Sequence, residues 1–422
     1  MTRVGLTLQP DPVFLDLLDE TISSDVDYFE VAPETLWFAD ADGAVRPNGF
    51  HDRFAELRER TGKPFVAHGV GLSMASSSDS DRARRRRWLD RVRADGDVFG
   101  FEWYSDHYGA SVLGGYALTL PVPLPNDDAT VAATRTCLSE MQTVVDCVAV
   151  ENTAFYFCLD HPLREAEALA DIASGGFHLV LDLHNLYAME RNFGVPAEAY
   201  LERLPLGAVI EIHVAGGTNS DPAWTPSRRA LYLDSHDRRV PQRVWKLLRD
   251  VAPRCPHLRG VTLERMEGTV TRRDVPMIRE DIATARELLQ SGSGSPAPPS
   301  RHSGSAPIPR LVEDRATLER ILAGALLAPD PLEALRCRRD AEPLVAALEG
   351  QRDELALAAA LIARLRFERL VQGHAAAAAA FDANPRELVE RFRRYHAEVA
   401  PAAMFPLEEA ALFDRWIAAT GT

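Results

Sequence analysis

The sequence predicts an α/β protein, a (β/α)8 TIM barrel followed by a small all-α domain. Three features of the 422 residues support this prediction. Short apolar runs alternate with helical patterns up to about residue 290, a Ser/Gly/Pro-rich stretch follows, and the remainder has apolar residues at helical spacing. We therefore divide the chain into a barrel at 1–290, a flexible linker at 291–309 and a helical domain at 310–422.

Eight apolar runs before the linker are expected to be strands. They are RVGLTL near Gly5, DYFEVA near Phe29, PFVAH ending at His68, FGFEWYSDH ending at His107, VVDCVAVEN ending at Asn152, FHLVLDLHN ending at Asn185, AVIEIHV around His213 and LRGVTLE ending at Glu264. The expected helices between them include 50–61, 129–145, 164–174, 197–204 and 240–251. Eight β-then-α units fit a closed parallel barrel better than an open sheet.

The linker reads SGSGSPAPPSRHSGSAPIP, and almost all of it is Ser, Gly, Pro or Ala. Such a segment cannot bury a core. Beyond it, 312–416 is rich in Ala, Leu, Glu and Arg, and Asn384-Pro385 marks a turn between helical patterns. This part of the chain therefore predicts the small all-α domain.

Composition limits the partners and the compartment. The net charge of -15 argues against a broad phosphate-binding surface. The basic run from Arg82 to Arg87 is either a solvated helix face, which we favour, or a local nucleic-acid patch. Five scattered cysteines without CxxC spacing argue against a disulfide framework and a zinc ribbon. With no signal-peptide core and no apolar stretch of membrane-spanning length, we expect a soluble cytoplasmic protein that binds neither nucleic acid nor membrane.

Polar residues stand where the apolar strands end. They are His68, Asp106 and His107, Glu151 and Asn152, Asp182 followed by His184 and Asn185, His213, the loop pair Asp234 and His236, and Glu264. Burying such a group without a partner costs roughly 2–7 kcal/mol, and the carboxyl ends of barrel strands share one rim. Together the groups would satisfy one another best by binding divalent metal ions. Imidazoles and carboxylates without thiolate suit Zn, Fe or Mn, and so many ligands favour two or three ions.

Each of these residues has an ordinary structural explanation when taken alone. A single strand-end histidine is usually a satisfied core or loop residue, Glu151 could cap a helix, and Asp234 could stabilise a turn. The order along the rim is harder to explain in this way. Asp234 and His236 alternate on extended backbone and would point to the same side. The set as a whole therefore predicts a metal site.

These motifs resemble two groups of barrels. The order of ligands is similar to that of endonuclease IV and xylose-isomerase-like barrels, which is a resemblance of fold. A closer resemblance is to DUF692, the multinuclear non-heme iron-dependent oxidative enzymes (MNIO), which include the methanobactin biosynthesis enzyme. Its segments are HGVGLS at His68, EWYSDHYG around His107, VENTAFYF at Glu151, LDLHNLY at Asp182, EIHVAGG at His213, LDSHDRRVPQRVW around His236 and VTLER at Glu264, and they span nearly all of 1–290.

The resemblance implies which residues form the site. The implied metal ligands are His68, His107, Glu151, Asp182, His213, Asp234, His236 and Glu264. Three neighbours are implied to take part in catalysis. Asp106 stands where the family commonly has Glu, His184 stands where it commonly has Asn, and Asn185 lies where related barrels place another ligand. These departures leave the number of metal ions open.

The resemblance also implies an activity. Two or three iron ions of mixed ferrous and ferric state, with O₂ as co-substrate, would oxidise a side chain, often cysteine, in a ribosomally synthesised precursor peptide. Members of the family commonly act with a separate protein that captures the leader of the peptide. We hypothesise that the fused helical domain supplies this capture in cis. An unrelated docking or dimerisation module is the alternative.

Two other functions use the same residues. One is a metal-dependent hydrolase or isomerase like endonuclease IV or xylose isomerase. A nuclease would need a basic face beside the metals, and a sugar isomerase usually needs a lysine, of which Lys63 and Lys246 are the only two. The other is a peptide-binding scaffold that has lost its metals, and the near-complete ligand set argues against it.

Overall fold

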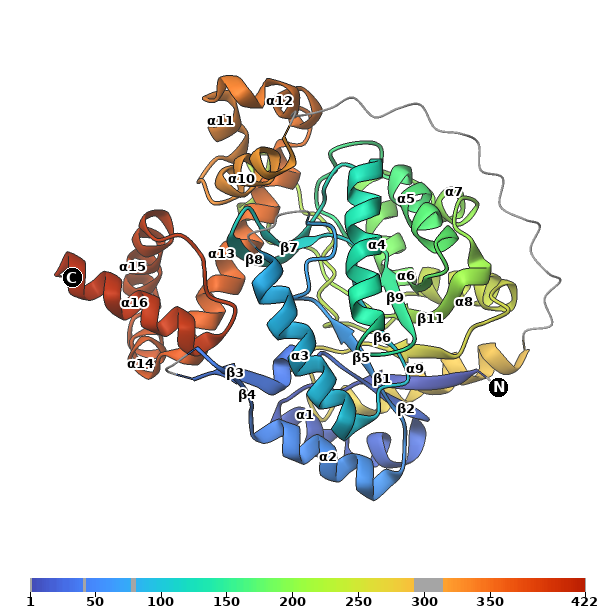
Figure 1. Ribbon diagram of the computed structural model, residues 1–422. Helices are drawn as coiled ribbons and strands as arrows, with labels where there is room; N and C mark the ends of the chain where they lie inside the picture. Colours follow the sequence, from blue (N-terminus) through green and yellow to red (C-terminus); the bar gives the residue numbers. More distant parts are fainter. Residues whose placement is uncertain (1, 41–42, 77–80, 292–313, 422) are drawn as a thin grey trace.

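The computed structural model describes residues 2–40, 43–76, 81–291 and 314–421 (Figure 1). The predicted linker lies outside the described residues except for Ser291. The eight predicted strands form a closed parallel barrel in the order β1-β12-β11-β10-β9-β6-β5-β2, which confirms the predicted fold. They are β1 (Arg3–Thr7), β2 (Tyr28–Val31), β5 (Phe65–Gly69), β6 (Tyr104–His107), β9 (Val148–Glu151), β10 (His178–Asp182), β11 (Val209–Val214) and β12 (Gly260–Leu263).

Helices surround the barrel. They are α1 (Pro12–Leu17), α2 (Gly49–Thr61), α3 (Arg82–Phe99), α4 (Asp128–Gln142), α5 (Leu163–Ser174), α6 (Leu183–Phe193), α7 (Ala197–Leu201), α8 (Gln242–Val251) and α9 (Val275–Ser291). The prediction that the sixth strand extends to Asn185 is wrong, because β10 ends at Asp182. The Asp182 carboxylate accepts a hydrogen bond from the Asn185 backbone N–H at 2.8 Å and caps α6. His184 and Asn185 therefore lie in the first turn of a helix.

The basic run lies on α3, as expected for a helix face. The Arg85 side chain is buried and donates to the Ser76 carbonyl, whereas Arg86 and Arg87 are exposed. Among the described residues, no helix is both long and apolar enough to cross a membrane.

A buried polar layer fills the barrel toward the amino ends of the strands. The Glu211 carboxylate accepts hydrogen bonds from Tyr28 Oη at 2.8 Å and from Trp103 Nε1 at 2.6 Å. A Cβ atom on Gly5 or Gly260 would lie 2.4 or 2.3 Å from atoms of Tyr28, so only glycine fits beside this side chain. The layer supports His213, two residues farther along β11 than Glu211.

Two β-hairpins that the sequence analysis did not predict follow β2 and β6. They are β3–β4 (Trp37–Ala39 and Val45–Pro47) and β7–β8 (Ala110–Leu113 and Tyr116–Val122). The second hairpin contacts the helical region, and β8 lies against α13 (Figure 1).

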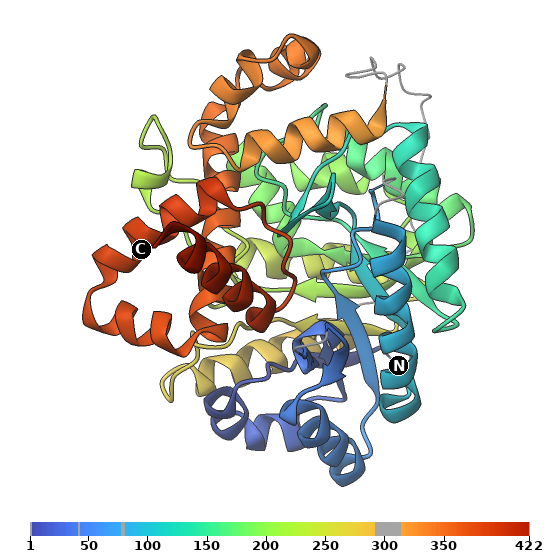
Figure 2. The same cartoon turned by 60° about the vertical axis from the view of Figure 1, so that its left-hand side comes forward.

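The carboxyl-terminal region is helical, as predicted. It contains α10 (Arg315–Leu326), α11 (Pro331–Arg336), α12 (Glu342–Leu348), α13 (Arg352–Gly373), α14 (Ala375–Ala383), α15 (Pro385–Glu398) and α16 (Pro406–Thr420). Buried leucines of α10–α13 share one apolar cluster with the connections that follow β5, β6, β9 and β11, which contribute Ala75, Leu118 of β8, Phe157 and Leu233. The helical region therefore packs on the rim formed by the carboxyl ends of the strands (Figure 2).

A buried ion pair stabilises the helical region. Arg366 Nε donates to Glu409 Oε1 at 2.8 Å, and both side chains are almost fully buried. Replacing Glu409 with alanine should lower the unfolding free energy by about 3–5 kcal/mol, because an uncompensated guanidinium would remain buried. Glu390→Ala, which removes an exposed ion pair with Arg386, is the matched control. It should change the unfolding free energy by less than about 1 kcal/mol. Equal shifts in the thermal unfolding of the two variants would contradict this expectation.

Candidate metal centre

Five imidazoles and five carboxylates gather at the carboxyl ends of the barrel strands. They form five groups of three in which the possible ligand atoms lie within 4.8 Å of one another. The groups are Glu30, His68 and His213; His68, His107 and Glu151; Glu151, Asp182 and His213; Asp182, His236 and Glu264; and His184, Asp234 and His236. The structure thus brings together all eight residues that were predicted as ligands, and adds Glu30 and His184.

Glu151 lies among the imidazoles of the first three groups. Its Oε2 is 3.0 Å from His107 Nε2 and 3.2 Å from His68 Nε2, and its Oε1 is 3.0 Å from His213 Nδ1. Glu151 and Asp182 each belong to two groups, and so does His236. The shared residues connect the groups into one row that can hold more than one ion with bridging carboxylates.

Hydrogen bonds orient two of the imidazoles. His68 Nδ1 lies 2.9 Å from Ser105 Oγ, and His107 Nδ1 lies 3.1 Å from the Gly69 carbonyl oxygen. In each ring the Nε2 atom is left facing Glu151. Metal-binding histidines are commonly held in this way, with one nitrogen bonded to the protein and the other free for the ion.

Several buried atoms of the centre make no hydrogen bond in the part of the chain that the structure describes. They are Oε2 of Glu30, Glu151 and Glu264, and Nε2 of His213. They do lie within ion-pair distance of neighbouring groups, as Glu30 Oε2 and His213 Nε2 do at 3.0 Å. Buried polar atoms that make no hydrogen bond lose free energy relative to water, and a bound cation would satisfy all four. Within the described ranges, no cysteine belongs to any of the five groups. Imidazole and carboxylate donors fit a divalent transition metal.

Glu30 was missed by the sequence analysis. Its Oε1 accepts from Thr7 Oγ1 at 2.7 Å, and its Oε2 lies 3.0 Å from His213 Nε2. The predicted ligands are polar residues at strand ends, whereas Glu30 lies inside the four-residue strand β2. The available signal was a single carboxylate within the apolar run DYFEVA.

Asp106 is not brought into the centre. It lies on the opposite side of β6 from Ser105 and His107, and its carboxylate accepts from the backbone N–H groups of Leu72 at 3.0 Å and His107 at 2.7 Å. Burial, with a further contribution from Glu34, raises the pKa of Asp106 to about 7. Its contacts tie the loop after β5 to β6.

The two other predicted catalytic residues lie beside the predicted metal ligands. His184 Nδ1 is 2.8 Å from Asp234 Oδ1, and its Nε2 is 3.1 Å from Tyr232 Oη. Asn185 Nδ2 donates to the Asn152 carbonyl at 2.9 Å, and its buried Oδ1 makes no hydrogen bond with any described residue. His184 is therefore part of a possible ligand group, whereas Asn185 lies next to Asp182 with a free acceptor.

The charges of the centre are strongly coupled. Burial opposes protonation of His68, but the charge of Glu151 raises the pKa of His68 to about 10. The same holds for His236. Burial alone would lower its pKa, but the negative charge of Asp234 raises the pKa of His236 to about 10. Burial and the neighbouring Glu264 raise the pKa of Asp182 well above its usual range. A metal ion that binds here must therefore displace protons, as metal ions do in sites built from imidazoles and carboxylates.

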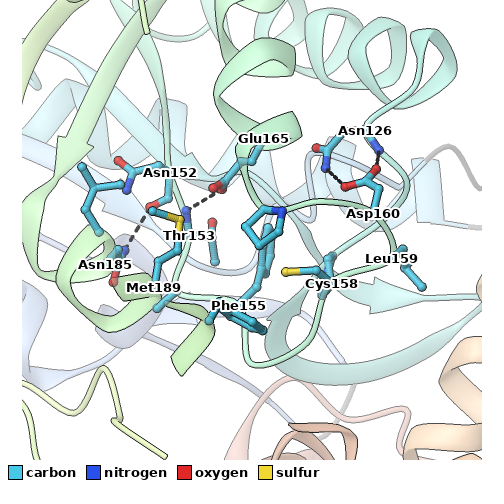
Figure 3. A pocket seen from close by; sticks show the side chains of 15 residues that line it. Asn126, Asn152, Thr153, Phe155, Cys158, Leu159, Asp160, Glu165, Asn185 and Met189 are labelled. Atoms are coloured by element: carbon cyan, nitrogen blue, oxygen red, sulfur yellow. Dashed lines mark hydrogen bonds between the residues drawn. The ribbon is translucent and has the colours of Figure 1, made fainter. Parts of the chain in front are cut away.

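A narrow hollow lies beside the centre, between α6 and the loop after β9 (Figure 3). Asn152 and Asn185 line it, and Asn152 Nδ2 donates to the Asp182 carbonyl at 3.0 Å. The centre of a water molecule could occupy about 20 Å³ of this hollow, which is room for about one water. Glu165 is buried and lines this hollow. Its carboxyl group accepts hydrogen bonds from the Thr153 N–H and from Tyr200 Oη, at 2.9 Å each.

Stability should depend on pH through Glu165. Burial raises its pKa from 4.5 to about 8, so the folded protein holds a proton that the unfolded chain has released above pH 4.5. The folded state therefore loses stability as the pH rises from about 4.5 to 8, by an amount on the order of 4 kcal/mol. Relative to Glu165→Gln, which cannot titrate, the native protein should become less stable between pH 5 and pH 9 in urea unfolding. A difference between the two proteins that stays constant with pH would contradict this expectation.

Comparison with known proteins identifies the family. The family described as RiPP precursor modification enzyme MbnB/TglH/ChrH matches residues 3–290. A UPF0276 protein of Rhizorhabdus wittichii is 32% identical over 245 residues, which cover 58% of this chain and 80% of that protein. One of Paraburkholderia phytofirmans is 30% identical over 280 residues, which cover 66% of this chain and 85% of that protein.

Solved structures of similar fold have low sequence identity. D-psicose 3-epimerase from Clostridium cellulolyticum is 11% identical with a TM-score of 0.43, over 68% of this chain and 98% of that chain. Endonuclease IV from Thermus thermophilus is 16% identical with a TM-score of 0.40, over 68% of this chain and 99% of that chain. The match over residues 3–290 covers the whole barrel and every residue of the five ligand groups, and the chain belongs to the enzyme family of RiPP precursor modification enzymes MbnB/TglH/ChrH.

Proposed function

We propose that this chain uses two or three iron ions and O₂ to oxidise a side chain, with cysteine the expected residue, in a ribosomally synthesised precursor peptide. The observation that carries this proposal is the connected row of ligand groups in which Glu151 and Asp182 are shared. A mononuclear site needs only about four to six donors, whereas ten residues converge here.

The donor types support iron. His68, His107 and Glu151 form a set of two imidazoles and one carboxylate, and so do His184, His236 and Asp234. This combination with open positions is typical of non-haem Fe(II) enzymes that use O₂. When bound, iron would supply electron transfer to O₂ and would make a coordinated substrate thiol easier to deprotonate.

We infer the direction of peptide approach from the burial of the ligand groups. The side chains of His107, Asp234 and His236 are 16%, 19% and 14% exposed, whereas Glu30 and His213 are fully buried. The partly exposed residues would face the peptide. The buried pair would form the floor of the centre and exclude water from it.

Hydrolase or isomerase chemistry on the same ligand set is the alternative. Lys63 Nζ donates to the carbonyls of Ile22 and Ser23, at 2.8 and 2.7 Å, and is therefore held away from the ligand groups. Lys246 lies on α8 in the outer ring of helices. The contacts of Lys63 favour the oxidative proposal over a sugar isomerase that depends on a lysine.

The test uses full-length protein purified without oxygen, loaded with Fe(II) and mixed with a cysteine-bearing peptide encoded beside its gene. We expect a change in peptide mass that requires both iron and O₂, measured by mass spectrometry. Turnover that proceeds without O₂, or equally well with zinc, would favour the hydrolase or isomerase instead.

The helical region is the proposed site of peptide capture in cis. Capture predicts that the full peptide binds more tightly than a peptide without its leader, as measured by isothermal titration with the full-length protein. Equal affinities would leave docking or dimerisation as the role of this region.

A further inference from the structure

We infer that the helical region is a structural part of the metal centre, because it holds the loop that carries Asp234 and His236. The inference rests on the proposed metal site and concerns how two of its ligands are positioned. Both ligands lie on the connection between β11 and α8, which is outside the barrel sheet. The other residues of the ligand groups lie on barrel strands, directly after one, or in the first turn of α6.

The loop has two different faces. Leu231 and Leu233 are buried in the apolar cluster that contains leucines of α10–α13. Tyr232 and Asp234 alternate with them and bind His184, through Tyr232 Oη at 3.1 Å and Asp234 Oδ1 at 2.8 Å. Since neighbouring residues on extended backbone point to opposite sides, the helices cover one face while the other face forms the centre.

Polar contacts fix the same loop to the first turn of α13. Arg229 Nη1 donates to Glu354 Oε1 at 2.8 Å, and its Nη2 donates to the Asn192 carbonyl at 2.6 Å. The Ser227 backbone N–H donates to Asp353 Oδ1 at 3.0 Å. The loop is thus tied to the helical region by side chains that precede the two ligands by only a few residues.

A third contact reaches the ligand itself. The Asp234 backbone N–H donates to Tyr156 Oη at 3.2 Å, and Tyr156 is buried in the same apolar cluster as the helical leucines. The cluster therefore borders the ligand-bearing backbone from two sides, through Leu233 and through Tyr156.

His236 needs such support because its backbone is strained. Its φ is +49°, in the left-handed region that residues other than glycine adopt at a cost of roughly 1–2 kcal/mol. Its carbonyl accepts from the Met266 N–H at 3.1 Å. A strained residue keeps its conformation only when its surroundings hold it, so loosening the loop should let His236 relax away from the centre.

The test compares two double variants in the full-length protein. Asp353→Ala/Glu354→Ala removes the polar ties to the loop. Glu333→Ala/Glu349→Ala removes two carboxylates beside Arg336, 61% and 65% exposed, in the same region, and is the matched control. Bound iron is counted by elemental analysis, Mössbauer spectra report the occupied sites, and competition with a chelator gives the affinity of the most weakly bound ion.

We expect the first variant to bind its weakest ion about 10–100-fold less tightly and to lose one Mössbauer component, while the control keeps the wild-type values. The inference is overturned if wild type binds several ions and the first variant retains all of them with unchanged affinity. If wild type binds no ion, the proposed function fails instead. Should the double variant unfold, as seen by circular dichroism, Glu354→Gln alone decides by the same measurements.

Discussion

Glu151→Gln is expected to abolish peptide modification and to remove more than one metal ion from the protein. The two carboxylate oxygens of the native Glu151 lie 3.0–3.2 Å from nitrogens of His68, His107 and His213, and Glu151 belongs to two of the ligand groups. An amide of the same shape has one oxygen and no charge, so it cannot bridge two cations. Replacing a residue that only hydrogen-bonds to a ligand typically lowers metal affinity about 10–100-fold. For Glu151→Gln, which changes a ligand itself, we expect metal affinity to fall by more than about 100-fold.

Elemental analysis and mass spectrometry of the peptide measure this result. Glu165→Gln is the matched control, because Glu165 is also buried but belongs to none of the ligand groups formed by the described residues. It should retain the wild-type metal content. A Glu151→Gln protein with wild-type metal content would show that Glu151 is not a bridging ligand.

Removing the metal ions is expected to lower the thermal unfolding midpoint by roughly 10 °C or more. Asp182 and Glu264 share one ligand group, and burial together with the charge of Glu264 raises the pKa of Asp182, because like charges repel without a cation. An ion present at a hundred times its Kd stabilises the folded state by about 2.7 kcal/mol, so two ions contribute about 5 kcal/mol. For a domain of this size each kcal/mol corresponds to roughly 2–4 °C.

Differential scanning calorimetry before and after chelation measures the shift. The same chelator should move the midpoint of Glu151→Gln far less, since that protein has few ions to lose. Equal midpoints for native protein with and without metal would mean that the cluster does not bind metal in the folded state.

Much of the barrel could be predicted because its signals are local. Each strand is a short apolar run, and the carboxyl ends of parallel strands share one rim, so the order from His68 to Glu264 predicted which side chains would meet. The family resemblance rests on the same segments. Local pattern also predicted the helical region, although not where it packs.

The differences between the prediction and the structure have physical causes. Glu30 was missed because it points into the barrel from within β2, and Asp106 was included because strand alternation was not applied to β6, where Ser105 and His107 face inward. His184 was placed on a strand because the capping role of Asp182 ends β10 early. The packing of α10–α13 on the ligand loop depends on contacts more than a hundred residues apart, such as Arg229 with Glu354, which no local pattern encodes.

A multinuclear iron centre can be tested by metal analysis of protein purified without oxygen. Elemental analysis combined with Mössbauer spectroscopy should find two or three irons per chain, partly ferrous and partly ferric. A single ion per chain, or full occupancy by zinc or manganese with iron unable to restore any activity, would contradict it.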